Sequence, residues 1–330
     1  MNDKKKGTLG LAALLMGTAA VSLVWAAQPA PATAPACNRD CLLKLADTYL
    51  AAVVAHDPSK VPFAADARFV EQAKRIKPGE GLWKTAGAVN VEFKVLVPDE
   101  FAQQVGGIVM LLSEGKPMQM GFRLKLVNGK VTEAEHVLAA PRETSMGNLT
   151  KLRPAIPMEI PYEYADSRGR MIHIAKSYYD ALDNNNGYLA PFAADCERHE
   201  NGMRTAPNGG PSLGGVDVPG QVPRPASLQG MQSCTSQLQS NTFEYIERLD
   251  NRRVDIADEK TGLALGLSHF RHHQVKKEFD VYNDPSRTKS TMNFTQDLPA
   301  LHIFKIWGGQ IHDIEAMGFT APANSPSGWE

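Results

Sequence analysis

The 330-residue sequence lacks an excess of charge of either sign. Its 35 Lys and Arg residues are balanced by 36 Asp and Glu residues, which leaves a formal net charge of −1. Nucleic acids and anionic lipids are bound through a positive field, so this balance argues against both as partners. A small molecule or another protein is the expected partner.

Several motifs of common enzyme classes are also missing. The chain has no G-x-S-x-G elbow, no phosphate-binding glycine loop and no H-E-x-x-H metal motif. The pairs Gly209-Gly210 and Gly214-Gly215 lie in a proline-rich stretch, where they do not lead from a strand into a helix. We therefore expect a protein that uses no cofactor and no metal.

Long apolar runs are absent except near the N-terminus. Three lysines at residues 4–6 precede an apolar segment at residues 9–24, and small residues follow it. This order is typical of a secretory signal peptide, and the segment is short for a membrane span. We predict a signal peptide at 1–27, a linker at 28–37, and a periplasmic or secreted protein without membrane contact. An uncleaved anchor is the alternative, because Trp25 lies next to the expected cleavage site.

Cysteine is scarce, with four residues in the exported part of the chain: Cys37, Cys41, Cys196 and Cys234. An even number in an oxidising compartment suggests two disulfides, although the sequence alone leaves three pairings open. Proximity favours Cys37 with Cys41, and Cys196 with Cys234. Lipidation of Cys37 is an alternative, although TAPAC lacks the leucine that normally precedes a lipidated cysteine.

One five-residue motif, PFAAD, occurs twice, at residues 62–66 and 191–195, so that the copies are 129 positions apart. At the same offset, LADTYLAAV at 45–53 aligns with IAKSYYDAL at 174–182, and both segments carry apolar residues at helical spacing. Each copy therefore predicts an amphipathic helix that leads into a PFAAD turn, which Asp66 and Asp195 would cap or close. This repetition indicates a duplicated domain.

Strand-like stretches follow each PFAAD motif in the same order. They lie at 91–97, 106–112 and 122–138 in the first copy, and at 252–258, 262–270 and 301–317 in the second. The last stretch of each copy contains a hairpin turn, at Asn128-Gly129 and at Gly308-Gly309. A helix followed by antiparallel strands, repeated, predicts an α+β protein.

The domain boundaries follow from this repeat and from the proline content. We predict a first domain at 38–143, a proline-rich linker at 144–168, a second domain at 169–322 and a tail at 323–330. The second copy also contains an insertion at 201–230 that is rich in glycine and proline. Long loops of this kind often serve as lids or binding loops.

The order of a Tyr-bearing helix, a FAAD turn, an acid-bearing strand and a final hairpin resembles the SnoaL-like and nuclear-transport-factor-two-like superfamily. Both copies resemble it, and the tandem arrangement behind a C-x-x-x-C start is similar to a family of secreted double-domain proteins. The resemblance implies two tandem cones, each a curved antiparallel sheet wrapped around N-terminal helices, which pair as an intramolecular pseudo-dimer. Because the superfamily includes isomerases, dehydratases, cyclases, epoxide hydrolases and non-catalytic binders, the fold alone does not imply a function.

Among enzymes of the superfamily, the local pattern is similar to that of ketosteroid isomerases. That match implies Tyr178 as the oxyanion-stabilising tyrosine, Glu200 as the general base and His302 as a third polar group. Tyr49 and Glu71 take the first two places in the first copy. Here Glu replaces Asp and His replaces an acid, so the identity of the reaction does not carry over.

The chemistry of these residue types supports the same class of reaction. A carboxylate in an apolar cone has a raised pKa and becomes a base near neutral pH, and a tyrosine hydroxyl stabilises a developing oxyanion. Together they allow proton abstraction next to a carbonyl, followed by isomerisation, elimination or ring closure. The alternative is that Tyr178 is a core residue and that Glu200 pairs with Arg198 on the surface.

Histidine is concentrated in the second copy, which holds seven of the nine, beyond position 170. In SHFRHH, His269 and His273 would share one strand face without a carboxylate or cysteine at ligand spacing, so no metal site is predicted. We instead expect Arg198, His199, His269 and Tyr179 to line a pocket in the second copy. The sequence therefore predicts a lyase or isomerase for a small apolar or aromatic carbonyl compound, with a non-catalytic binding module as the alternative.

Overall fold

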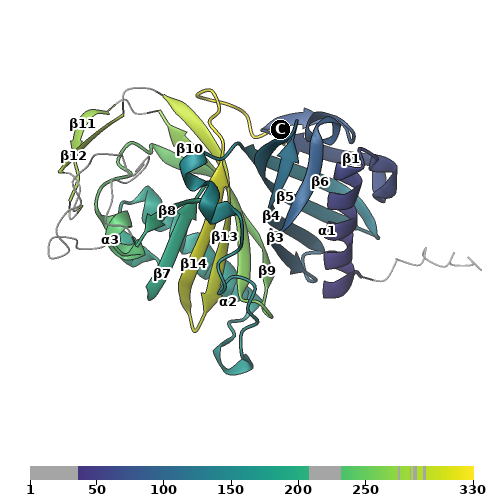
Figure 1. The fold of residues 1–330 in the computed structure, drawn as a ribbon. Helices are drawn as coiled ribbons and strands as arrows, with labels where there is room; N and C mark the ends of the chain where they lie inside the picture. Colours follow the sequence, from purple (N-terminus) through teal and green to yellow (C-terminus); the bar gives the residue numbers. More distant parts are fainter. Residues whose placement is uncertain (1–35, 208–231, 274–275, 283, 285–287, 293–294) are drawn as a thin grey trace, which may run out of the picture. The chain divides into compact units, whose positions relative to one another are not determined.

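The computed structural model describes residues 36–207, 232–273, 276–282, 284, 288–292 and 295–330 (Figure 1). The predicted signal peptide, nearly all of the 28–37 linker and most of the 201–230 insertion lie outside these residues. Within the described part of the chain, no helix combines the length and the apolar character that crossing a bilayer requires.

The first half of the molecule consists of one helix and six strands. Helix α1 (Arg39–Val54) begins at Asn38, whose side chain accepts a hydrogen bond from the backbone N–H of Cys41 at 3.0 Å, as is typical of an N-cap. The helix buries Leu42, Ala46 and Tyr49, which are spaced three or four residues apart. The strands are β1 (Phe63–Glu71), β2 (Lys74–Ile76), β3 (Ala86–Asp99), β4 (Gln104–Ser113), β5 (Lys116–Val127) and β6 (Lys130–Ala139).

The second half repeats this plan with additions. Its elements are α2 (Arg168–Asp183), β7 (Phe192–Glu200), β8 (Met203–Ala206), α3 (Cys234–Gln239), β9 (Arg248–Asp258), β10 (Leu263–His272), β11 (Lys276–Asp280), β12 (Lys289–Met292), β13 (Gln296–Trp307) and β14 (Gln310–Gly318). Strands β11 and β12 form a separate two-stranded sheet, which the sequence analysis did not predict. Five short 3-10 helices connect the elements of the two halves: η1 (Pro58–Lys60), η2 (Gly81–Lys84), η3 (Glu143–Leu149), η4 (Tyr162–Tyr164) and η5 (Gly187–Leu189).

The two main sheets have the same strand order. The first runs β2-β1-β6-β5-β4-β3 and the second runs β8-β7-β14-β13-β10-β9, so each strand has a counterpart in the other sheet. The predicted duplication and the α+β fold of two tandem cone-type domains are therefore confirmed. One detail differs, because β1 pairs with β6, and β7 with β14, in parallel, which makes both sheets mixed rather than antiparallel.

The hairpin predictions are confirmed, whereas the PFAAD segments are not turns. Asn128, Gly129, Gly308 and Gly309 all have positive φ angles between paired strands. The PFAAD residues from Phe onward instead begin β1 and β7. Asp66 is an exposed strand residue and caps no turn, and the Asp195 carboxylate lies 2.7 Å from Nδ1 of His312.

The insertion begins later than predicted. Asn201 and Gly202 form a turn with φ angles of 47° and 76°, and Met203–Ala206 then pairs with β7 as edge strand β8. An Asn-Gly pair favours such a hairpin turn because both residues tolerate positive φ. The glycine- and proline-rich residues 208–231 lie outside the described part of the chain.

Both predicted disulfides are present. Cys37 is bonded to Cys41 beside the start of α1, and Cys196 on β7 is bonded to Cys234 at the start of α3. The second bond joins residues on either side of the insertion, with a sequence separation of 38.

Three clusters of buried side chains form the core. One belongs to the first half and one to the second. The third combines residues from both main sheets, including Val95 and Ile108 of the first and Leu265 and Ile303 of the second. Gly106 on β4 makes a close approach possible, since a Cβ there would lie 2.7 Å from Cδ1 of Leu265.

Polar contacts attach the proline-rich linker to the second sheet. Arg153 forms ion pairs with Asp313 and with Glu315, at 3.0 Å in the second case. The ammonium group of Lys305 donates hydrogen bonds to the carbonyl of Ile156 at 3.2 Å and to that of Thr261 at 2.6 Å. These contacts give a buried cation the partners that it needs.

The C-terminal tail places an aromatic ring among cations. The ring of Trp329 lies within 5.2–5.7 Å of the guanidinium carbons of four arginines, namely Arg68, Arg75, Arg123 and Arg253. Three of these arginines belong to the first half, so the tail contacts it directly.

Candidate functional site

Strand β7 presents alternate side chains to opposite faces of the second sheet. Cys196 and Arg198 are buried on the face toward α3, whereas Glu197 and His199 lie on the face toward the linker residue Arg153. Glu200 follows on the same face as Arg198, because side chains repeat every second residue in a strand. The strand therefore separates two groups of ionisable residues.

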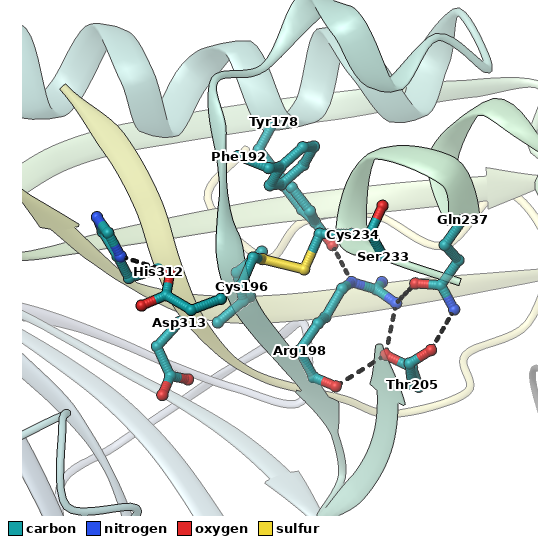
Figure 2. Close-up of a disulfide and its surroundings, with 12 residues drawn as sticks. Tyr178, Phe192, Cys196, Arg198, Thr205, Ser233, Cys234, Gln237, His312 and Asp313 are labelled. Atoms are coloured by element: carbon teal, nitrogen blue, oxygen red, sulfur yellow. Dashed lines mark hydrogen bonds and ion pairs between the residues drawn. A yellow bond between two sulfur atoms is a disulfide. The ribbon is translucent and has the colours of Figure 1, made fainter. Parts of the chain in front are cut away.

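Arg198 lies at the centre of the inner group and is fully buried. Figure 2 shows its guanidinium directed toward the Tyr178 hydroxyl and toward Thr205 and Gln237. The Nε–H group donates to Tyr178 at 2.8 Å, and one terminal nitrogen donates to Thr205 at 2.9 Å and to Gln237 at 3.3 Å. The other terminal nitrogen forms an ion pair with Glu200. A buried cation is tolerated only with such partners, so Arg198 is held in one position.

Tyr178 belongs to the core and does not line the cavity described below. Its hydroxyl accepts the hydrogen bond from Arg198, and burial raises the pKa of Tyr178 to about 12, although the Arg198 charge opposes the rise. The neighbouring Tyr179 is also fully buried, and its hydroxyl lies 3.2 Å from Nδ1 of His302. Both rings pack against His302, at 5.4 and 5.3 Å, and Tyr179 is the one whose hydroxyl forms a hydrogen bond with it.

A cavity of about 90 Å³ extends into the second half, and we call it the inner cavity. Glu200 and His302 both line it, together with apolar side chains that include Phe243, Phe270 and Leu298. Burial, together with the charge of Arg198, lowers the pKa of His302 to about 3, so its ring is neutral at physiological pH. A carboxylate and a neutral imidazole thus lie in one apolar space.

A larger hollow of about 610 Å³ adjoins the inner cavity, and we call it the vestibule. Both spaces are lined by Glu200, Asn201, Tyr245, His272, Leu298 and Gly318. Glu200 therefore lies where the narrow apolar space meets the wide one. Its side chain is 25% exposed, which agrees with this position at the opening.

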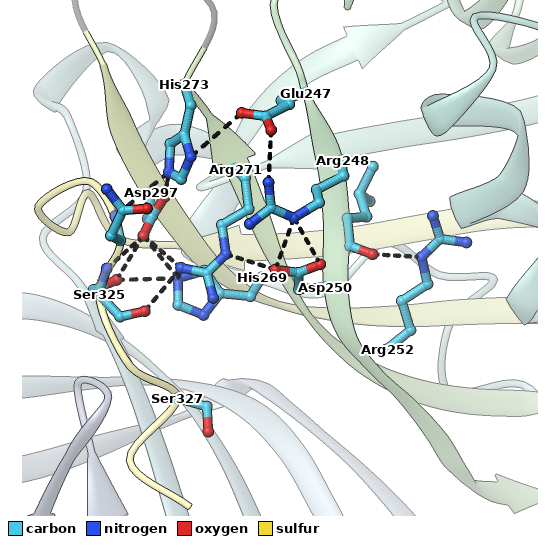
Figure 3. Close-up of polar contacts among 12 residues, drawn as sticks. Glu247, Arg248, Asp250, Arg252, His269, Arg271, His273, Asp297, Ser325 and Ser327 are labelled. Carbon is cyan, nitrogen blue, oxygen red and sulfur yellow. Dashed lines mark hydrogen bonds and ion pairs between the residues drawn. The ribbon is translucent and has the colours of Figure 1, made fainter. Parts of the chain in front are cut away.

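His199 and His269 lie away from the inner cavity. Nε2 of His199 is 2.6 Å from the Glu197 carboxylate on the outer face, and burial and the Arg153 charge lower the pKa of His199 to about 4. Figure 3 shows His269 in a separate polar cluster around Asp297. There Nε2 of His269 lies 3.1 Å from the Ser325 hydroxyl, and Arg271 donates to Asp297 at 2.6 Å.

Several residues of the site were not among the predicted ones. His272 lines both spaces, its ring packs edge-on against Tyr245 at 5.1 Å, and burial lowers its pKa to about 4. Within the described residues, no hydrogen-bond partner is present for its buried Nδ1. The histidine-rich SHFRHH run drew attention to this part of the chain. The alternation of side chains along a strand correctly placed His272 on the face opposite to His269.

The first half has different residues at the positions equivalent to those of the inner cavity. Glu71 lies opposite His136, and Glu200 lies opposite Ala316, in equivalent strand pairs. His136 in turn lies opposite Phe122, as Ala316 lies opposite His302. The 129-residue offset also matches Phe69 with Arg198. The counterparts of Arg198, His302 and Ala316 are therefore Phe69, Phe122 and His136.

These substitutions close the first site. Nε2 of His136 lies 2.7 Å from the Tyr49 hydroxyl, and Nδ1 lies 2.9 Å from the Glu71 carboxylate. That carboxylate also accepts the backbone N–H of Leu82 at 3.1 Å. Trp83 packs edge-on against Tyr49 at 5.5 Å, and all these side chains are buried. Tyr49, His136 and Glu71 are therefore bonded to one another in a filled core.

Metal ligands do not gather in either half. Among the described residues, no three His, Cys, Asp or Glu side chains form a group that could hold a metal ion.

Comparison with protein families gives one match. The model of a domain of unknown function (DUF8021) matches residues 36–138 and 164–318, which together make up most of the chain. The chain belongs to this family. No curated protein matches the DUF8021 chain.

Solved structures with a similar fold match the DUF8021 chain over less than half of its length. An NTF-2 like protein of unknown function from Burkholderia xenovorans is 17% identical, with a TM-score of 0.26, and the match covers 31% of this chain and 85% of that one. A putative polyketide cyclase from Xanthomonas campestris is 17% identical, with a TM-score of 0.28 and coverages of 46% and 90%. A putative SnoaL-like polyketide cyclase from Jannaschia is 10% identical, with a TM-score of 0.27 and coverages of 47% and 89%. These likenesses concern the fold alone.

Proposed function

We propose that the second half of the chain is a cofactor-independent lyase or isomerase that acts on a small aromatic carbonyl compound. The observation that carries this proposal is that Glu200 and His302 line one apolar cavity. Aromatic walls favour a planar apolar group, and the two polar side chains supply a base and a hydrogen-bond donor. No third component is needed for proton transfer.

Glu200 is the proposed base. Its carboxylate is held by Arg198, which is itself fixed by Tyr178, Thr205 and Gln237. The ion pair orients Glu200 at the opening of the inner cavity, where it removes a proton from the carbon next to the carbonyl. Tyr178 then acts as a positioning residue through Arg198 rather than as a direct oxyanion donor.

His302 is the proposed partner of the carbonyl oxygen. A Tyr179 hydroxyl that donates to Nδ1 leaves the ring proton on Nε2, and the neutral ring donates that proton as a hydrogen bond to the developing enolate. Its pKa of about 3 keeps the ring from taking up a second proton. His302 therefore stabilises charge, while Glu200 carries the proton.

Deuterium exchange tests the base directly. With 4-hydroxyacetophenone in D₂O as the probe, the wild-type chain is expected to exchange the acetyl protons, which NMR follows over time. Glu200→Gln removes the base and should slow the catalysed exchange by about 100-fold or more. The control Glu197→Gln alters the neighbouring carboxylate on the outer face and should leave exchange within about twofold. Exchange at the wild-type rate in Glu200→Gln would exclude this residue as the base.

A non-catalytic binding module is the second candidate, and one observation favours it. The guanidinium of Arg198 already engages the Glu200 carboxylate in an ion pair, which is a purely structural use of the same group. This candidate predicts that the probe binds, that Ala316→His abolishes binding by filling the cavity, and that no exchange above background occurs.

We also propose that the chain is exported and that its first half is a structural partner in a pseudo-dimer. The two disulfides favour an oxidising compartment, and the third core cluster joins the sheets of both halves. Mass spectrometry of the mature protein should find an N-terminus near residue 28, and retention of residues 1–27 would contradict cleavage.

A further inference from the structure

We propose that the ligand of the second half is amphipathic, with an aromatic end in the inner cavity and a polyhydroxylated group, such as a sugar, in the vestibule. This inference rests on the proposed binding site and names the class of compound that it takes.

The inner cavity is too small to hold a complete ligand. Its volume is about 90 Å³, whereas an engineered protein cavity of about 150 Å³ binds a single benzene ring. Any aromatic compound that enters must therefore project past Glu200 into the vestibule. The vestibule, at about 610 Å³, lies within the range of ordinary ligand pockets.

The side chains change character between the two spaces. Most of the inner lining is aromatic or aliphatic, whereas the vestibule combines hydroxyl and amide groups with apolar side chains such as Met203 and Met292. Four of these polar side chains form no hydrogen bond with other described residues: Thr144, Thr291, Gln296 and Thr320. They are available to a ligand.

Neutral hydroxyls are the groups that match this lining. Threonine and glutamine side chains both donate and accept hydrogen bonds, as sugar hydroxyls do. Among the described residues that line the vestibule, Arg142 and Glu200 carry charge, and Glu200 is already paired with Arg198. An apolar tail would cover polar side chains without replacing their hydrogen bonds to water, which costs free energy.

A matched pair of compounds tests the inference. Isothermal titration of the full chain compares 4-hydroxyacetophenone with its 4-O-glucoside, which differ only by the sugar. We expect the glucoside to bind at least 10-fold more tightly. The double variant Thr144→Val/Thr291→Val should remove most of this preference and leave the affinity for the aglycone within about twofold.

Two control variants separate the spaces. Thr48→Val changes a threonine on α1, far from the vestibule in the sequence and absent from its lining, and should alter neither affinity. Ala316→His fills the inner cavity and should weaken both compounds by 10-fold or more. Circular dichroism confirms that each variant is folded before titration.

The outcomes distinguish the inference from the proposed function. A glucoside that binds no more tightly than the aglycone, or a preference that survives in Thr144→Val/Thr291→Val, overturns the inference, while exchange that depends on Glu200 still supports the function. A clear glucoside preference without catalysed exchange supports the inference and overturns the lyase or isomerase. If neither compound binds, both are overturned.

Discussion

The two halves of the chain share the same order of helix and strands, and they differ in the side chains that this fold encloses. Tyr49 and Tyr178 lie at the same point of equivalent helices, and Glu71 and Glu200 end equivalent strands. In the first half the tyrosine and the glutamate are joined by a histidine in a filled core. In the second half an arginine joins them, and a cavity opens beside them. A few side chains thus determine whether the same fold encloses a filled core or a cavity.

The outer faces of the two sheets show a second contrast, in buried carboxylates. Glu135 and Glu315 are equivalent, since they lie one residue before His136 and Ala316. Burial raises the pKa of Glu135, but the charges of Arg253 and Arg123 outweigh this effect and leave the pKa below its ordinary value. Burial raises the pKa of Glu315 to about 7, because Arg153 opposes it only in part and Asp313 lies close by. The same residue type in the same place therefore has opposite effects on stability.

Replacing each of these two glutamates by glutamine is expected to give the largest difference in the free energy of unfolding. The free energy of unfolding falls as the pH rises from about 4.5 through 7, because Glu315 ionises in the unfolded chain before it ionises in the folded one. The shift in the pKa of Glu315 corresponds to about 3 kcal/mol. Glu315→Gln should therefore stabilise the protein by up to about 3 kcal/mol at pH 8 and have little effect at pH 4. Glu135 contributes stability above its unfolded pKa, so Glu135→Gln should cost about 3 kcal/mol or more at pH 8.

Urea unfolding at pH 4, 6 and 8 measures both variants. The Glu315→Gln gain must grow with pH, and the Glu135→Gln loss must shrink as the pH falls below the ordinary range for glutamate. Equal losses for both variants at pH 8 would contradict the contrast in their surroundings.

Replacing the buried cation gives the next largest effect. Arg198→Met removes the charge that pairs with Glu200 and the donor that Tyr178, Thr205 and Gln237 accept from, and should cost about 3 kcal/mol or more. Phe69→Met changes the equivalent residue of the first half between apolar side chains of similar size, and should cost less than about 1.5 kcal/mol. Urea midpoints at pH 7 compare the two variants. A loss in Phe69→Met as large as that in Arg198→Met would show that size, not charge, matters at this position.

The two disulfides are expected to differ by about 2 kcal/mol in what their removal costs. The entropy of loop closure grows with loop length, and the sequence separations are 4 for Cys37 and Cys41, and 38 for Cys196 and Cys234. Cys196→Ala/Cys234→Ala should cost about 4 kcal/mol, and Cys37→Ala/Cys41→Ala about 2 kcal/mol. Thermal unfolding under oxidising conditions ranks them. The reverse ranking would show that local packing outweighs loop length.

The order of helices and strands could be predicted from the sequence because the patterns that specify it are local or occur twice. The 129-residue offset aligned the helices and strands, Asn128-Gly129 favours one kind of hairpin, and proximity favoured the observed disulfides. The parallel pairing of β1 with β6 was not predictable in this way, because it joins residues far apart in the sequence.

The site was harder to predict because most of its side chains are buried on more than one face of their helix or strand. Tyr178 and Tyr179 are both buried, and the rotation of α2 decides which hydroxyl forms a hydrogen bond with His302. Every residue of β10 is buried, so alternation separates His269 from His272 without showing which face adjoins the cavity. The packing between elements, rather than the pattern within one, selects these side chains.

The Cys196–Cys234 bond has a consequence for how well the protein tolerates changes in the segment that the bond closes. Because a covalent link already joins the two ends of the intervening segment, changes in its length add little strain to β7 or α3. Mutations that lengthen, shorten or rewrite this segment are thereby separated from the arginine two residues beyond Cys196. An insertion or deletion between Cys196 and Cys234 should therefore leave the contacts of Arg198 with Tyr178 and Glu200 in place.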